Sequence, residues 1–499
     1  MKSTFVVVLG SLLALPLSAN AAGESAQLFG RPVTTVAPLT AAEEAQRRAD
    51  FEAMLERNDW VMVGDQVLPR ESVYGLAGAQ EPSDAPAAWD EAPHRATIFL
   101  NFNGASLSSG NNAALNKSPC VDAPIDYPGF TGTEQQALAL INVFETKMEP
   151  YGVRLAYEKR PPAHLPYAMV MMGGTPQLLG MQQGVLGVSC SNDCGDQYWR
   201  DLTFAFTGAL NGNNTETLGN IALHEAAHAF GLAHIAGPEH MMYPFANPGN
   251  KEWASGCTAY DDSTGGINCN YTHEQFCGDG AEQQNSVAEL MAYFGTNSVD
   301  TVPPTVNILE PADGLELSAG SSVQVKVDVS DDHEGFGWKL VLPNHDIELV
   351  AYDFETTWDL NKLPAGEYII RVEAIDHERN ESFDEVTIYV GEDAPATTGD
   401  DSGTTGDDSG TTGDDSSVTT GPDEPTTAGP GDDDDDDDDD DSGVGTDAGT
   451  ESGDAACLEG DECDKGCGCS SPGRGEWPSG AWALALLILA ARPRRRARA

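Results

Sequence analysis

One stretch of sequence decides the fold of this 499-residue chain: LHEAAHAFGLAH, residues 223–234. His224 and His228 are four positions apart, so on a helix their imidazoles project from one face and can bind the same metal ion. Glu225 lies beside the first histidine and can act as general base on a water at that metal. Gly231 fits a left-handed helix end, and the turn after it can bring His234 back as a third ligand. Three neutral nitrogen ligands leave one position of a tetrahedral zinc ion open, as in catalytic sites.

Strand and helix patterns alternate around this stretch. Asparagines in residues 211–214 can cap a helix that begins near Thr215 or Glu216. Residues 133–151 have the apolar face of a helix. Strands are expected at residues 96–102, 153–158, 167–172 and 202–206. We therefore expect a mixed α+β layer fold for residues 94–298.

The spacing H-E-x-x-H-x-x-G-x-x-H, followed by Met-Tyr-Pro at residues 242–244, resembles the metzincin zinc metallopeptidases with a matrixin-like Met-turn. The resemblance implies a catalytic domain with a mixed sheet, an active-site helix and a Met-turn. It implies one catalytic Zn²⁺ bound by His224, His228 and His234, with Glu225 as the catalytic base. The implied activity is that of a zinc metalloendopeptidase, which hydrolyses protein or peptide substrates.

The resemblance also implies roles for the residues that follow the histidines. Met242 would form the hydrophobic floor under the metal, while Tyr243 and Pro244 would border the substrate pocket. Residues 283–294 would be the last helix of the domain. An extended substrate would bind along residues 202–206 or along the region of Cys190.

The sequence departs from the named metzincin families at three points, so the family stays open. Ile235 follows the third histidine, where those families carry a characteristic polar residue or proline. Tyr243 adjoins Met242 and is a poor candidate for a tyrosine that approaches the zinc. Residues 22–119 contain no cysteine, so a thiolate that blocks the metal is not expected. His240, near the turn, is interpreted as a surface histidine.

The two regions that flank this domain are of different kinds. Residues 1–21 have the charged start, apolar run and Ala-Asn-Ala end of a signal peptide. Residues 22–93 are an N-terminal extension or a pro-segment, with a helix expected at residues 41–57 behind Thr40. Residues 302–391 contain short strands of alternating polarity, which predict a β-sandwich. Pro-Pro-Thr-Val at 303–306 and Ala-Ile-Asp at 374–376 resemble bacterial immunoglobulin-like modules.

The net charge of −54 comes from 80 acidic and 26 basic residues. Phosphates would be repelled, so nucleic acid is not an expected partner. Residues 394–456 form a low-complexity acidic linker whose composition cannot bury a core, and they include ten consecutive aspartates at residues 432–441. We expect an extended, solvated and disordered spacer there.

Residues 457–499 form a cysteine-rich tail with a short apolar helix at residues 481–491 and a terminal arginine cluster. With Gly-Cys-Gly-Cys at residues 466–469, this order resembles the sorting tails of myxobacterial surface proteins. The resemblance implies export machinery and a tail-processing enzyme as partners, with processing at Cys467 or Cys469. The apolar helix would then be a transient or processed membrane anchor, and the protein would lie at the surface of a Gram-negative, myxobacterial cell. An ordinary transmembrane helix that stays as the anchor is the alternative.

The other six cysteines all lie between residues 120 and 277, and in an exported chain they predict disulfides. Cys190 and Cys194 are close enough in sequence to close a small loop. Cys257 can pair with Cys269 or Cys277. A Ca²⁺ site is a second cofactor to consider, although no EF-hand spacing accompanies its candidate ligands, Asp261, Asp262, Asn268 and Asp279.

These observations predict a secreted or surface-displayed zinc endopeptidase. A first alternative is a surface adhesion or binding protein with a slow or vestigial peptidase domain. A second alternative is a structural cell-wall protein whose zinc serves stability alone. The complete motif favours the enzyme, because a vestigial site usually loses Glu225 or a histidine first.

Overall fold

The computed structural model describes residues 27–74, 92–194, 197, 199–208, 214–261, 267–278 and 280–391. The signal-like segment, the acidic linker and the tail with Cys467 and Cys469 lie outside these ranges. Within them, no helix combines the length and the apolar character needed to cross a bilayer.

A five-stranded sheet forms the centre of the region that carries the histidines. Its strands, in spatial order, are β10 (Val153–Ala156), β6 (Ala96–Asn101), β11 (Ala168–Met172), β13 (Leu202–Ala205) and β12 (Gly187–Val188). The first four run parallel, and β12 is antiparallel to β13 at the edge. The segment at 202–206 is therefore an interior strand. The prediction that it borders a substrate cleft is wrong, because an interior strand has no free edge. Its backbone pairs on both sides, and its side chains are buried.

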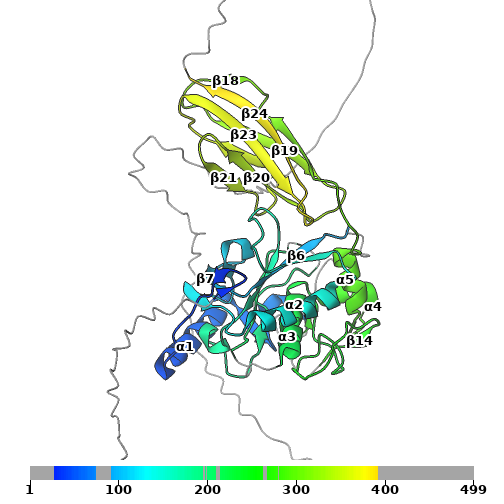
Figure 1. The fold of residues 1–499 in the computed structure, drawn as a ribbon. Helices are drawn as coiled ribbons and strands as arrows, with labels where there is room; N and C mark the ends of the chain where they lie inside the picture. The colour runs from blue at the N-terminus through cyan, green and yellow to red at the C-terminus, as the bar shows by residue number, and fades with distance from the viewer. Residues whose placement is uncertain are drawn as a thin grey trace, which may run out of the picture. The chain divides into compact units, whose positions relative to one another are not determined.

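Both faces of the sheet are covered. Ile98 and Leu100 point into one core, which α2 (Glu134–Met148) and α3 (Thr215–Ala229) complete. The two helices lie against each other, as Figure 1 shows. Phe99 points to the opposite face, because side chains alternate along a strand, and joins a second core.

The N-terminal segment contributes to that second core. Its helix α1 (Ala41–Asn58) begins with a capping box between Thr40 and Glu43 and buries Phe51 and Met54. A hairpin follows, with β3 (Trp60–Val63) and β4 (Gln66–Pro69). The helix expected at 41–57 is confirmed, and the segment is packed against the rest of the domain.

The remaining elements before residue 300 are short. They comprise β1 (Gln27–Leu28), β2 (Arg31–Pro32), η1 (Arg70–Ser72), β5 (Val73–Tyr74), β7 (Gly104–Ser109), η2 (Ala113–Leu115), β8 (Lys117–Ser118), β9 (Ile125–Pro128), η3 (Pro176–Leu179), β14 (Thr258–Ala259), β15 (Ile267–Asn268), α4 (Asn270–Cys277), β16 (Gln283–Gln284) and α5 (Ser286–Phe294). The helix expected at 283–294 is shorter, because Asn285 caps it and its first residues form β16 instead.

Residues 305–390 form a β-sandwich, as the alternating valines predict. One sheet has the order β17 (Thr305–Glu310), β19 (Val323–Ser330), β22 (Thr357–Leu360). The other has the order β18 (Leu315–Leu317), β24 (Glu381–Val390), β23 (Gly366–Ile375), β20 (Gly337–Leu342), β21 (Ile347–Val350). Val325, Ile370 and Ile388 are buried on its inner faces.

Three disulfides link Cys120 to Cys190, Cys194 to Cys269, and Cys257 to Cys277. The expectation that Cys190 and Cys194 close a small loop by pairing with each other is wrong. Cys190 follows the edge strand and is buried in the second core with Cys120, whereas Cys194 lies beside the end of α3. The pairing of Cys257 with Cys277 is one of the two alternatives that the sequence left open. Three disulfides are typical of an exported protein.

Candidate metal centre

Helix α3 and the turn after it bring the three predicted histidines together. The Nε2 atoms of His224 and His228 are 3.0 Å apart, and each lies 3.1 Å from Nε2 of His234. All three side chains are at most 8% exposed. Asn214 begins the helix by accepting a hydrogen bond from the Thr217 amide, as the asparagine-rich turn predicts.

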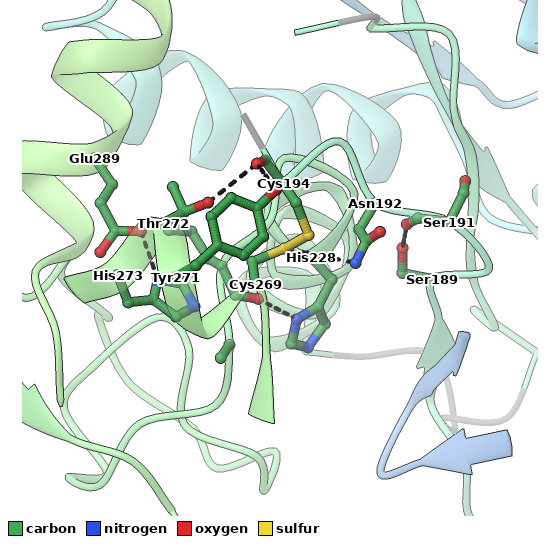
Figure 2. Close-up of a disulfide and its surroundings, with 12 residues drawn as sticks. Ser189, Ser191, Asn192, Cys194, His228, Cys269, Tyr271, Thr272, His273 and Glu289 are labelled. Carbon is green, nitrogen blue, oxygen red and sulfur yellow. Dashed lines mark hydrogen bonds and ion pairs between the residues drawn. A yellow bond between two sulfur atoms is a disulfide. The ribbon is translucent and has the colours of Figure 1, made fainter. Parts of the chain in front are cut away.

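The turn depends on Gly231, which follows the end of α3 at φ +103°. Only glycine adopts this conformation without strain. A Cβ atom here would also lie 3.2 Å from Sγ of Cys269. Figure 2 shows the disulfide of Cys269 with Cys194, whose carbonyl accepts hydrogen bonds from Tyr271 and Thr272. The disulfide thus braces the position where the chain turns back towards His234.

Backbone carbonyls orient two of the imidazoles. Nδ1 of His224 lies 2.7 Å from the carbonyl oxygen of Met241, and Nδ1 of His228 lies 2.6 Å from that of Leu232. A proton on Nδ1 satisfies each carbonyl and leaves the lone pair on Nε2, directed at the other histidines. Burial, and next the charge of His224, lower the pKa of His228 to about 4, which favours its neutral form.

Asp65 completes the group from the N-terminal segment. It lies in the two-residue turn of the β3–β4 hairpin, after Gly64 at φ +62°. Its Oδ1 is 3.0 Å from Nε2 of His234 and 3.2 Å from Nε2 of His228, and its Oδ2 is 3.4 Å from Nε2 of His224. Burial alone would raise the pKa of Asp65, but the charge of His234, and next the contacts with the three imidazoles where these carry a proton on Nε2, hold it well below its ordinary value.

These four side chains fit a divalent metal ion. Ligand atoms about 3.3 Å apart are what a tetrahedral ion with bonds of about 2.0 Å requires. Nitrogen lone pairs and a carboxylate that face one another at such distances are stabilised by a cation between them. The geometry is therefore compatible with a metal, whereas zinc as the metal stays a prediction.

Glu225 lies next to this group without a partner of its own. Its side chain is 1% exposed, and its Oε2 has no hydrogen-bond partner among the described residues. Burial, and next the charge of Asp65, raise the pKa of Glu225 well above its ordinary range. A Cβ atom at Gly187 would collide with its Oε1, so the edge strand β12 passes directly over this carboxyl group. A buried carboxyl with a raised pKa is typical of a residue that exchanges protons.

A cleft of about 500 Å³ opens onto these groups. His224, Glu225 and His234 line it, whereas His228 is fully buried behind them. Tyr243 and Pro244 form part of its wall, where the resemblance placed the substrate pocket.

The two methionines at the predicted Met-turn differ in their surroundings. Met241 lines the cleft, whereas Met242 is wholly buried in the core and does not line it. His240, interpreted from the sequence as a surface histidine, is half-buried and also lines the cleft.

One residue of the site, Asp65, was missed from the sequence. The run Val61-Met62-Val63-Gly64-Asp65-Gln66-Val67 has the signature of a hairpin with a tight Gly-Asp turn, which would have placed Asp65 at a hairpin tip. No local signal connects that tip with residues about 160 positions later. Of the four candidate calcium ligands, Asp262, Asp279 and the side chain of Asn268 lie outside the described residues, so the Ca²⁺ site stays a prediction.

No protein-family model and no curated protein matches the chain. Among solved structures, a fibronectin(III)-like module of Clostridium thermocellum CbhA is 20% identical with a TM-score of 0.16, and the match covers 18% of this chain and 48% of that one. The PKD1 domain of Vibrio anguillarum Epp is 17% identical with a TM-score of 0.14, covering 18% and 94%. The endo-β-1,4-mannanase of Thermotoga petrophila is 11% identical with a TM-score of 0.15, covering 52% and 61%. At these TM-scores none of the likenesses bears on the fold or the activity of this chain.

Proposed function

We propose that residues 94–298 are a zinc-dependent endopeptidase of the metzincin type. The observation that carries the proposal is the convergence of His224, His228 and His234 beside an unpartnered, buried Glu225, at the inner end of a cleft. A mixed sheet with an antiparallel edge strand, and Tyr243 and Pro244 at the cleft wall, support it further.

The three histidines would hold the metal. When bound, Zn²⁺ would supply Lewis-acid polarisation of the scissile carbonyl and a lower pKa for an attacking water. Glu225 would accept the proton of that water on its carboxylate and deliver it to the leaving amine. Burial around Glu225 suits this exchange, because a base with a raised pKa holds the proton between the two steps.

The edge strand β12 would align the substrate. It pairs with β13 on one side only, and Gly187 lies over Glu225. An extended peptide that adds to this edge would have its backbone beside the carboxyl group that acts on it. Of the two substrate-binding segments that the sequence offers, this proposal chooses the region of Cys190, which β12 directly precedes.

The proposal includes the location and the partners. The protein would be exported and displayed at the surface of a Gram-negative, myxobacterial cell, with its tail recognised by a processing enzyme at Cys467 or Cys469. Mass spectrometry of the mature C-terminus from a producing cell tests this part. A C-terminus before residue 470 would support processing, and an intact Arg-rich end would contradict it.

The experiment that tests the activity is digestion of a peptide library with and without a zinc chelator. It uses the full chain and its Asp65→Asn variant, because Asp65 lies against the histidines. We expect cleavage that the chelator abolishes and added Zn²⁺ restores. If neither protein cuts any library peptide, or if the chelator has no effect on cleavage, the proposal is wrong.

A further inference from the structure

The N-terminal hairpin occupies the edge of the sheet at which a substrate would bind. The amide of Val67 donates to the carbonyl of Ser189 at 2.8 Å, and the amide of Ser189 donates to the carbonyl of Asp65 at 2.9 Å. Gln66 and Ser189 form a parallel bridge directly after β12. These two backbone bonds lie directly beyond β12 and follow the pattern that an added peptide strand would make there. The backbone N–H and C=O groups of Ser189, the residue directly after β12, are therefore already bonded to the hairpin.

At the tip of the hairpin, the Asp65 carboxylate covers the three histidines. Gly64 and Asp65 line the same cleft as His224 and Glu225. The Asp65 side chain is 19% exposed, whereas the histidine side chains are 0–8% exposed. The carboxylate thus reaches the ligand nitrogens from the accessible side, the side from which a substrate carbonyl or a water must approach.

The hairpin is held in this place by the rest of its segment. Arg47 of α1 donates to the carbonyl of Leu178 at 3.0 Å, and β5 pairs with β15. Asp65 is therefore delivered by a segment that precedes the first strand of the central sheet in sequence and is anchored at several points along it.

We propose that Asp65 is a removable fourth ligand of the metal and that the segment of residues 27–74 is an internal inhibitor, which keeps the enzyme latent until it is displaced. The inference rests on the proposed function and specifies its regulation. Asp65 fills the position that a catalytic metal keeps open for water, and the hairpin fills the substrate edge, so one segment blocks both. In this proposal the group that blocks the metal is a carboxylate. It is not a thiolate, since residues 22–119 contain no cysteine.

The test compares the full-length chain with Asp65→Asn, which keeps the shape of the turn but removes the anionic ligand. Asp65→Ala is the second variant. Asp59→Asn is the matched control, because it removes the same charge near the same hairpin and asparagine tolerates the left-handed conformation of Asp59. Each protein is loaded with Co²⁺ for absorption spectroscopy and with Zn²⁺ for metal content and peptide cleavage.

We expect the Co²⁺ spectrum to change in both Asp65 variants, with one metal still bound per chain by the three histidines. We expect their kcat/KM to rise about tenfold or more, because only the uncovered fraction of wild-type molecules can bind substrate. Asp59→Asn should match the wild type in all three measurements.

Three results would overturn the inference, each at a different point. An unchanged Co²⁺ spectrum would show that Asp65 is not a ligand. Loss of the metal without a gain in cleavage would make Asp65 part of a closed, structural site. A changed spectrum with no cleavage by any of the proteins would leave Asp65 as a ligand and remove the peptidase on which latency depends.

Discussion

Three groups of side chains in the described residues are close enough to share a metal ion, and two of them, which have no residue in common, differ in kind. The first is the histidine site, formed by Asp65, His224, His228 and His234. The second is the carboxylate cluster, formed by Asp300 before β17, Asp331 after β19 and Asp376 after β23. In each group the ligand atoms lie within 4.8 Å of one another. Proximity alone therefore does not distinguish them.

The surroundings of the two groups do distinguish them. In the histidine site, backbone carbonyls hold Nδ1 of two imidazoles and leave Nε2 for a metal, and an unpartnered glutamate lies in the same cleft. In the carboxylate cluster, Asp376 accepts hydrogen bonds from Asn380, and Asp300 lies 3.1 Å from Nδ1 of His333. Oriented ligands and a buried carboxyl group at a cleft are what a catalytic metal site requires, and the histidine site combines them.

The largest expected effect is a loss of zinc and of cleavage when a ligand of the histidine site is removed, but not when a residue of the carboxylate cluster is changed. His228→Ala should lose bound zinc, and cleavage should fall about 10³-fold or more, since the metal supplies several kcal/mol of transition-state stabilisation. Asp376→Asn should keep both the zinc and the activity. Metal analysis, peptide cleavage and circular dichroism of the two variants check this. Zinc loss in Asp376→Asn instead would reverse the comparison.

A smaller effect tests the contact between the edge strand and the base. In Gly187→Ala the new methyl group would push the Glu225 carboxyl aside, and a misplacement of about 1 Å can cost about 100-fold in rate. We expect kcat to fall by about 10- to 100-fold while zinc content stays the same. The control is Gly256→Ala, because no atom lies within 4 Å of a Cβ at that position. Equal kcat in both variants would show that β12 does not position the base.

The smallest effect concerns the carboxylate cluster. Burial, a hydrogen bond with Asp332 and the charges of Asp376 and Asp300 raise the pKa of Asp331 to about 7. The unfolded chain releases this proton near the ordinary pKa of 3.8, whereas the folded chain keeps it until about pH 7, so stability falls as the pH rises between these values. We expect the Tm of the wild type to decrease from pH 5 to pH 8 more steeply than that of Asp331→Asn. Parallel slopes would mean that Asp331 titrates normally.

Local patterns in the sequence predicted much of this arrangement. The spacing of His224 and His228, the glycine after the helix and the capping residues Thr40 and Asn214 each depend on a few neighbouring positions, and the structure places them as expected. The alternating valines of the sandwich are equally local, because one buried face specifies their register.

Long-range contacts could not be predicted in the same way. Asp65 reaches His224 across 159 positions, and Cys120 reaches Cys190 across 70. Both contacts depend on how the strands are ordered in the central sheet, above all on β12 as the edge next to β13. Without that order, local spacing predicts a bond between the neighbouring cysteines Cys190 and Cys194, and it offers the interior strand at residues 202–206 as a border of the cleft.

The central claim is tested most directly by Glu225→Ala, made both in the wild type and in Asp65→Asn, with zinc content and peptide cleavage measured on the same samples. Glu225 is not part of the predicted ligand group, so we predict that the variant keeps one zinc per chain. We predict that its cleavage falls by about 10²- to 10⁴-fold, the contribution of a general base. Cleavage at the rate of the parent proteins, with zinc bound, would contradict the assignment of this site as a zinc peptidase centre.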